Sequence, residues 1–338
     1  MASNPTELDK RGDLVLRLSA RDADSDPEPP SKDLRVCSRT MARASVVFEK
    51  MLFGPFKESQ KKGEDWVVEL PKDNIQSMTV ILAIAHGCRS IVPDHVTIPE
   101  LFELLVVGDK YSMAHLLHPY LRRWVPKTKN VVLDDDTLML AWIAREVGAK
   151  KLFETAIIEI AKHCHNGGEA GSLVRDNDRR SVFNSANAHI RAAGILDVVA
   201  VTHMDVLKGV LKPLREVTSQ TLDGRGCKAY SSQNDEVQIC ANSILGSLIR
   251  SCNLLGIDPG VTCLTDALST YPHSAYQVCW VIQVMRCDNI PYHDDCDPMR
   301  DIQRDTRRAF SDAAVTMSPS EQEHFRKQAE ISGWDETD

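Results

Sequence analysis

The sequence predicts an α+β protein, with a small sheet in its N-terminal third and a mostly helical remainder. Residues 13–20 and 65–71 alternate apolar and polar side chains with the period of two that marks a half-buried strand. From residue 130 onward, apolar residues instead recur every three or four positions, as they do on one face of a helix. The hydrophobic fraction of 43% and the charged fraction of 26% are typical of a globular chain.

The predicted sheet has three short strands. Leu14, Leu16 and Leu18 place one apolar face on the first strand, and residues 34–38 resume as a second. The intervening segment is rich in Asp and Pro, so it forms neither helix nor strand, and we expect the two strands to pair across it as an acidic, solvated hairpin tip. The third strand, residues 65–71, ends at a proline.

Short helices accompany these strands. Ser38 and Ser45 are the expected caps of the first two helices, and Gly54-Pro55 stops the second. Pro119 predicts a break near His118 in the last of them. The expected helices of this part lie at residues 38–45, 45–53, 73–87, 97–111 and 113–125.

The second part is helical with polar connections. Expected helices cover residues 134–148, 149–164, 197–214 and 236–256, and Gly148 ends the first of them. In the last, Cys240, Ile244 and Leu248 face inward. The residues from 312 on are polar and predict at most one marginal helix. The predicted organisation is an N-terminal tail at 1–12, a first domain at 13–129, a helical region at 130–311 and a polar tail at 312–338.

Charge and segment composition narrow the function classes. The formal net charge of −8 argues against general attraction to nucleic acid or to an anionic membrane. The first residues lack the apolar core of a signal peptide, and no apolar run reaches the roughly 20 residues that cross a bilayer. We therefore expect an intracellular chain, in the cytoplasm, the nucleus or both. In that setting its ten cysteines are expected to be mostly reduced.

Catalytic motifs are missing from the sequence. It contains neither a nucleophile elbow of the G-x-S-x-G type nor an H-E-x-x-H zinc helix, and it has no kinase-like set or phosphate-binding glycine loop. The prediction is a non-enzymatic chain that needs no cofactor.

The first 125 residues resemble a known family in several successive segments. These are the strand that Asp13 opens, "LRVCSRTMARASVVFEKML", "FKES", "WVVELP" and "LLVVGDKYSM". In this order they resemble the BTB/POZ fold, and "GPFKE" and "LPKDN" are similar to the variety found in filamentous fungi. "CANSILGSLI", "LLGIDP" and "IPYHDDCDPMRD" resemble a C-terminal region that accompanies such domains. The chain departs from the family where Cys37-Ser38-Arg39 replaces a common histidine, and in having only twelve residues before Asp13.

The resemblance implies a protein-interaction function. BTB domains self-associate or bind partners, and some are substrate adaptors of cullin-based ubiquitin ligases that carry a hydrophobic-x-Glu motif after the second helix. Phe56 and Glu58 match that motif and follow Phe53 at the helix end. The three residues are the predicted partner-binding site, for a cullin scaffold or a second copy of this chain. In the alternative interpretation, these residues bind no partner: Phe56 packs back on Phe53, and the Glu58 carboxylate is only solvated.

Cysteine and histidine suggest a rival function for the second part. Cys287, His293 and Cys296 are candidate zinc ligands, but zinc takes four, and the fourth would have to come from far along the chain. Cys227, Cys279 and His165 are available for this role. Without a second close pair, two buried thiols in a polar loop are the simpler interpretation. The open alternatives to an interaction module are a BTB-assembled zinc-binding or catalytic domain, and a nuclear scaffold or transcriptional cofactor.

Overall fold

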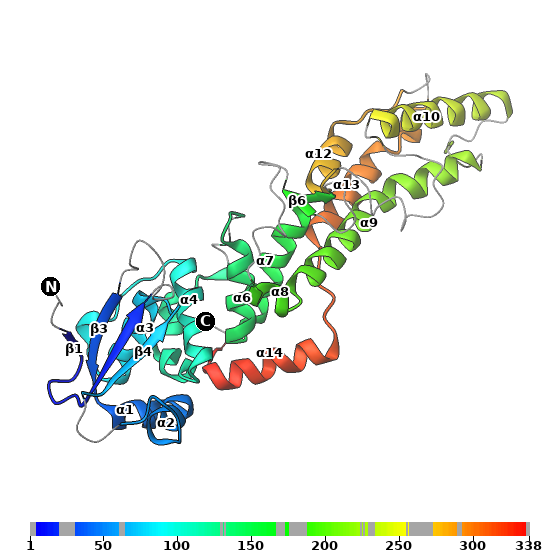
Figure 1. Ribbon diagram of the computed structural model, residues 1–338. Coiled ribbons are helices and arrows are strands. Elements are labelled where there is room, and N and C mark those ends of the chain that lie inside the picture. The colour runs from blue at the N-terminus through cyan, green and yellow to red at the C-terminus, as the bar shows by residue number, and fades with distance from the viewer. Residues whose placement is uncertain are drawn as a thin grey trace. The chain divides into compact units, whose positions relative to one another are not determined.

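The computed structural model falls into two compact units: the first combines helices with a small mixed sheet, and the second is mostly helical (Figure 1). The first unit comprises Met1–Val131, Met139–Phe153 and Ser318–Asp338, and the second comprises Val132–Leu138 and Glu154–Met317. The structure describes residues 5–19, 31–60, 65–128, 131, 133–166, 173–175, 188–223, 225, 227–228, 234–254, 256, 273–288 and 293–335. The coarse prediction of a chain that mixes helices with a small sheet is confirmed.

The sheet of the first unit has the strand order β1-β3-β2-β4. Its strands are β1 (Thr6–Glu7), β2 (Leu14–Ser19), β3 (Ser31–Val36) and β4 (Val67–Pro71). β2 runs antiparallel to β3 and parallel to β4, while β1 runs parallel to β3. Leu14, Leu16 and Leu18 are fully buried, as their alternation predicts. The segment between β2 and β3, residues 20–30, lies outside the described residues.

Strand β1 differs from the sequence prediction. It lies within the stretch expected to be a tail before Asp13, and Leu8 beside it is buried. Two residues are too few to show any periodicity, so the sequence gives no signal for this strand.

The helix pair α1 (Ser38–Ala44) and α2 (Val46–Phe53) lies side by side next to the sheet (Figure 1). Ser38 was predicted to cap α1, but this is wrong: the cap position is Cys37, and Ser38 is the first residue of the helix. The amide and hydroxyl of Ser38 instead donate to the Asp13 carboxylate at 2.8 and 2.7 Å. Burial acts to raise the pKa of Asp13, but these two hydrogen bonds, together with the Asp13 amide and the charge of Arg39, leave the pKa below its ordinary value. An ionised Asp13 therefore joins the start of β2 to the start of α1.

The remaining elements of residues 75–124 follow the predicted order. They are α3 (Ile75–Ala85), η1 (Arg89–Ile91), α4 (Ile98–Lys110), η2 (Ala114–Leu117) and α5 (His118–Trp124). The predicted break near His118 is confirmed, since η2 gives way to α5 there. Asn74 caps α3, because its side chain accepts from the Ser77 amide at 3.0 Å. The preceding residue, Asp73, is buried and accepts from the Tyr111 hydroxyl at 2.6 Å.

Helix α14 (Pro319–Ser332) completes the first unit and differs from the marginal helix expected after residue 312. Ser318 and Glu321 form a reciprocal capping box at its start, which satisfies two otherwise unpaired amides. Phe325 is buried against Phe153, with ring centroids 5.1 Å apart.

The end of helix α6 (Thr137–Val147) agrees with the prediction. Gly148 follows it in a left-handed conformation with φ of 79°.

The second unit is helical. Its elements are the C-terminal part of α7 (Lys150–His163), β5 (Cys164–Asn166), β6 (Leu173–Arg175), α8 (Ala188–Ala192), α9 (Ile195–Leu222), α10 (Asn234–Leu254), α12 (Ala275–Val284), η4 (Asp294–Cys296) and α13 (Met299–Ser311). α10, α12 and α13 each pack on α9. Buried apolar residues of these four helices form one core. The helices are labelled in Figure 1. Cys240, Ile244 and Leu248 face this core, as their helical spacing predicts.

Candidate functional site

Helix α2 exposes apolar side chains on the face that turns away from the core. Ser45 accepts from the Phe48 amide at 3.0 Å and fixes the start of this helix, as predicted. Phe48 and Leu52 point inward and are fully buried. Val46 and Phe53 are 57% and 56% exposed. The helix therefore has one side in the core and presents large apolar groups on the other.

The turn after α2 is held by hydrogen bonds. The Gly54 amide donates to the Lys50 carbonyl at 2.8 Å and ends the helix. The Ser59 amide donates to the Phe56 carbonyl at 3.2 Å, and the Trp66 indole donates to the Glu58 carbonyl at 2.7 Å. These bonds hold the backbone of the turn that carries Phe56 and Glu58.

The three predicted partner-binding residues differ in exposure. Phe56 is 56% exposed, and Phe53 contacts the Trp66 ring edge-on with centroids 6.0 Å apart. The Glu58 side chain is 22% exposed, and its carboxylate lies 3.8 Å from the Lys57 ammonium. Val46, Phe53 and Phe56, together with Glu58, are called the α2 surface below. Phe53, Phe56 and Glu58 are the predicted partner-binding residues, and the structure adds the exposed Val46.

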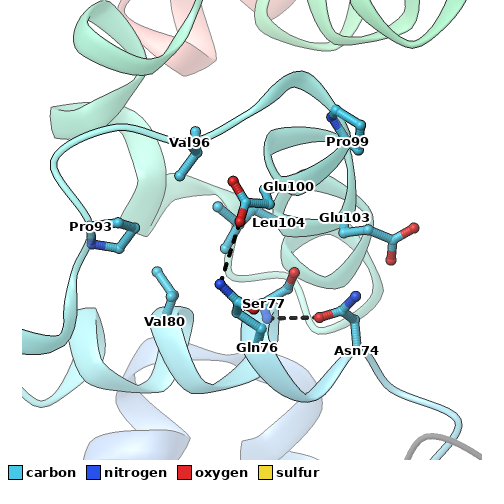
Figure 2. Close-up of a pocket in the computed structure, with 10 residues that line it drawn as sticks. All are labelled: Asn74, Gln76, Ser77, Val80, Pro93, Val96, Pro99, Glu100, Glu103 and Leu104. Atoms are coloured by element: carbon cyan, nitrogen blue, oxygen red, sulfur yellow. Dashed lines mark hydrogen bonds between the residues drawn. The ribbon is translucent and has the colours of Figure 1, made fainter. Parts of the chain in front are cut away.

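A small pocket lies between α3 and α4, with a loop through Pro93 and Val96 on one side (Figure 2). Its volume is about 190 Å³, and Val80 and Leu104 contribute apolar walls. Two of the polar residues around the pocket, Asn74 and Glu100, make hydrogen bonds that cap the first turns of α3 and α4. Hydrogen bonds from the amide and hydroxyl of Thr97 lower the pKa of Glu100, and Asn74 caps α3. A carboxylate kept ionised in this way is poorly suited to act as a general acid, and the described lining holds neither cysteine nor histidine.

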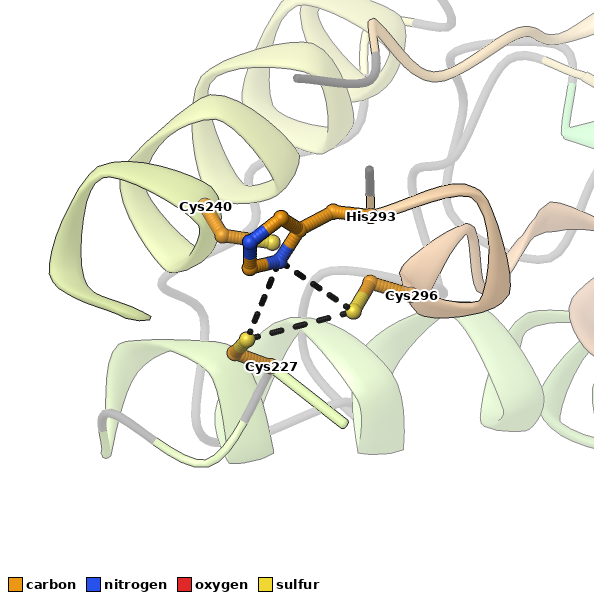
Figure 3. A group of neighbouring side chains, drawn as sticks. All are labelled: Cys227, Cys240, His293 and Cys296. Atoms are coloured by element: carbon orange, nitrogen blue, oxygen red, sulfur yellow. Dashed lines mark hydrogen bonds between the residues drawn. The ribbon is translucent and has the colours of Figure 1, made fainter. Parts of the chain in front are cut away.

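A second group of reactive side chains lies in the second unit. Cys227 follows α9, Cys240 lies on α10, His293 precedes the single turn η4, and Cys296 is the last residue of that turn. Figure 3 shows the three sulfur atoms and the imidazole directed toward one another. We call these four residues the Cys3His group. Cys240, His293 and Cys296 are buried, and Cys227 is partly buried.

The distances within the Cys3His group are short. The Cys227 sulfur lies 3.4 Å from His293 Nδ1 and 3.9 Å from the Cys296 sulfur. The Cys296 sulfur lies 3.7 Å from the same nitrogen, and all four donor atoms lie within 4.8 Å of one another. Burial raises the pKa of the Cys240 thiol to about 12, with further contributions from the thiols of Cys227 and Cys296. The arrangement brings three thiols and one imidazole to a single point.

The structure brings together only part of the predicted zinc set. His293 and Cys296 belong to the group, and so does Cys227, one of the distant residues considered for the fourth ligand. Cys287 does not belong to it: its sulfur faces the Ile244 carbonyl at 4.0 Å, and burial raises the pKa of its thiol. Cys279 and His165 are not members either. Cys240 was expected to be only a core residue of its helix, and its spacing gives no sign of another role.

No family model, curated protein or solved structure matches this chain. Within the described part of the chain, no helix is both long enough and apolar enough to cross a membrane.

Proposed function

We propose that the chain is a non-enzymatic protein-interaction module whose first unit is a BTB/POZ-type domain. The order of its elements supports this proposal. From β2 onward the unit has two paired strands, a helix pair, a third strand, then α3 and α4. This is the order that the sequence resemblance implies, and it positions Phe56 and Glu58 in the turn between the helix pair and the third strand.

The observation that carries the proposal is the exposure of three large apolar side chains on α2 and the turn that follows it. Val46, Phe53 and Phe56 each expose more than half of their surface. Aromatic residues of this kind are enriched among the anchors that dominate protein interfaces. Because hydrogen bonds fix the turn, less conformational freedom is lost when a partner covers Phe56.

Two kinds of partner fit the α2 surface. A second copy of the chain would form an isologous contact, in which the same residues face each other across a two-fold axis. Such a contact would use the exposed Val46 and Phe53 of α2. A cullin scaffold would take Phe56 into an apolar pocket, with Glu58 setting the register, and would make the chain a substrate adaptor. Its second unit would then recruit the substrate.

Replacing Phe56 by alanine is expected to weaken binding to a cullin N-terminal domain by about 30-fold or more. Loss of a central aromatic anchor costs roughly 2 kcal/mol or more, which corresponds to that factor. The Glu58→Ala variant should lose less affinity, with a slower association rate at low salt, because a charge at the rim of an interface mainly steers the encounter. Isothermal titration calorimetry on the full chain measures the affinities, and stopped-flow mixing measures the rate.

The matched control for this experiment is Trp280→Ala. Trp280 is an aromatic residue on α12 in the second unit and is 61% exposed, so its loss changes surface chemistry without touching the α2 surface. Wild-type affinity in this variant is expected. Equal affinity of the wild type and Phe56→Ala would refute the cullin form of the proposal, and so would equal weakening in the control.

A further inference from the structure

Four potential metal ligands converge in the core of the second unit from three separate segments. Cys227 follows α9, Cys240 lies in the first half of α10, His293 immediately precedes η4, and Cys296 is the last residue of η4 (Figure 3). More than 60 residues separate the first ligand from the last two. Chance packing of apolar residues rarely selects four Cys and His side chains and directs all their donor atoms to one point.

The distances match the edges of a zinc tetrahedron. Zn–S bonds are about 2.3 Å and Zn–N bonds about 2.0–2.1 Å, so tetrahedral angles place two sulfurs about 3.8 Å apart and a sulfur about 3.6 Å from a nitrogen. The Cys227 and Cys296 sulfurs are 3.9 Å apart, and each lies 3.4 or 3.7 Å from His293 Nδ1. Three of the six edges therefore agree with the ideal values within about 0.2 Å.

We propose that the Cys3His group binds one zinc ion as a closed structural site. Three thiolates and one neutral imidazole fill the four positions of a tetrahedron, which leaves none open for water or substrate. With Nδ1 on the metal, the remaining imidazole proton is on Nε2. Binding releases the protons of the three thiols, so the loaded site carries a net charge of −1. The Lys228 amide donates to the Cys296 sulfur at 3.2 Å, as outer hydrogen bonds to zinc thiolates do.

The Cys3His group lies in the core of the second unit, so a bound zinc ion would cross-link the segments that form this core. Cys240 and Cys296 are members of the core that α9, α10, α12 and α13 share, and Cys227 packs against it. A zinc ion there ties the end of α9 to α10 and to the turn before α13. Structural zinc contributes directly to folding free energy. The proposal concerns the second unit alone and does not depend on the partner-binding role of the first.

The first test is the zinc content of the purified full chain, measured by inductively coupled plasma mass spectrometry. We expect about one zinc per chain in the wild type and less than about one tenth of that in Cys240→Ser, since three ligands hold zinc far more weakly than four. The matched control is Cys252→Ser. Both cysteines lie on α10 and are 2% exposed in the same core, but only Cys240 belongs to the group. Equal zinc loss in both variants would overturn the proposal.

A second test does not depend on whether a serine variant folds. Metal-free full chain, titrated with Co²⁺ under reducing conditions, should take up one ion and show the intense visible absorption of tetrahedral cobalt with thiolate ligands. The His293→Cys variant retains four ligands and should still bind, whereas His293→Ala should not. A wild-type chain that carries no zinc and takes up no cobalt would contradict the site. So would a disulfide between Cys227 and Cys296 as the stable state of protein purified with zinc present.

Discussion

Replacing Phe48 by alanine is expected to lower the free energy of unfolding of the first unit by about 3–5 kcal/mol. Phe48 is fully buried, and its ring stacks on Tyr111 with centroids 4.9 Å apart. The substitution removes the apolar area of the ring and leaves a cavity beside Tyr111, whose hydroxyl is fixed on Asp73. Hydrogen exchange of the amides in β2 and β3 measures this loss in the first unit directly.

The matched control is Phe53→Ala, the same chemical change on the same helix. Phe53 is 56% exposed, so we expect a loss below about 1 kcal/mol. Comparing the Phe48→Ala and Phe53→Ala variants distinguishes the two faces of α2. Phe48 contributes to the stability of the unit, whereas Phe53 is available to a partner. Equal losses in both variants would show that Phe53 is part of the core, and the α2 surface would then not exist as described.

Replacing Gly148 by alanine is expected to cost about 2–5 kcal/mol and to detach α14 from the helices that it covers. The left-handed conformation of Gly148 is unfavourable for any residue with a Cβ. A Cβ there would also lie 2.6 Å from the Ala329 Cα, and closer still to its amide nitrogen. Since Ala329 is backbone inside α14, relief of this clash requires the helix to move. Limited proteolysis between residues 312 and 318 should become faster.

Gly87→Ala is the control for this prediction. Gly87 has a similar φ of 72°, but no atom lies within 4 Å of the position of its Cβ. This variant should lose only the roughly 1–2 kcal/mol of the left-handed conformation and should keep wild-type proteolysis at residues 312–318. If both variants behave alike, the close approach of Gly148 to α14 is not a constraint on the fold.

Elements that carry a clear local signal, such as a repeating pattern, a cap residue or a terminating glycine, could be predicted from the sequence. The alternation of Leu14, Leu16 and Leu18 predicted β2, the cap residue Ser45 predicted the start of α2, and Gly148 predicted the end of α6. In these cases a local physical requirement determines the element. A period of two buries one face of a strand, a side-chain oxygen satisfies a free amide, and glycine accepts a left-handed conformation.

Elements that depend on distant contacts could not be predicted. β1 is two residues long and exists because β3 offers a parallel partner. α13 buries Met299 and Ile302 of an otherwise charged segment against the core that it shares with α9; this amphipathic pattern is present in the sequence, but the prediction did not include it. For α14, the sequence Ser318-Pro-Ser-Glu321 carried a usable capping-box signal, and its high polarity obscured it.

The same distinction applies to the candidate sites. Phe56 and Glu58 lie in one short motif, so the sequence could suggest them, and the structure contributes the exposure of Phe56. The Cys3His group has only one close pair, His293 and Cys296, and its other two members are far away in sequence. Cys240 has the helical spacing of a core residue, which conceals a second role. Cys287 was closer in sequence but faces a backbone carbonyl.

The central claim is that the α2 surface holds a partner, and light scattering behind size exclusion on the full chain tests it most directly. The chain is measured alone and with a cullin N-terminal domain, at concentrations from about 1 to 100 μM, which bracket micromolar affinities. We predict a mass of two chains, or a complex that co-elutes with the cullin domain, and its loss in the double variant Phe53→Ala, Phe56→Ala. A single-chain mass at every concentration, with no co-elution, would contradict the claim.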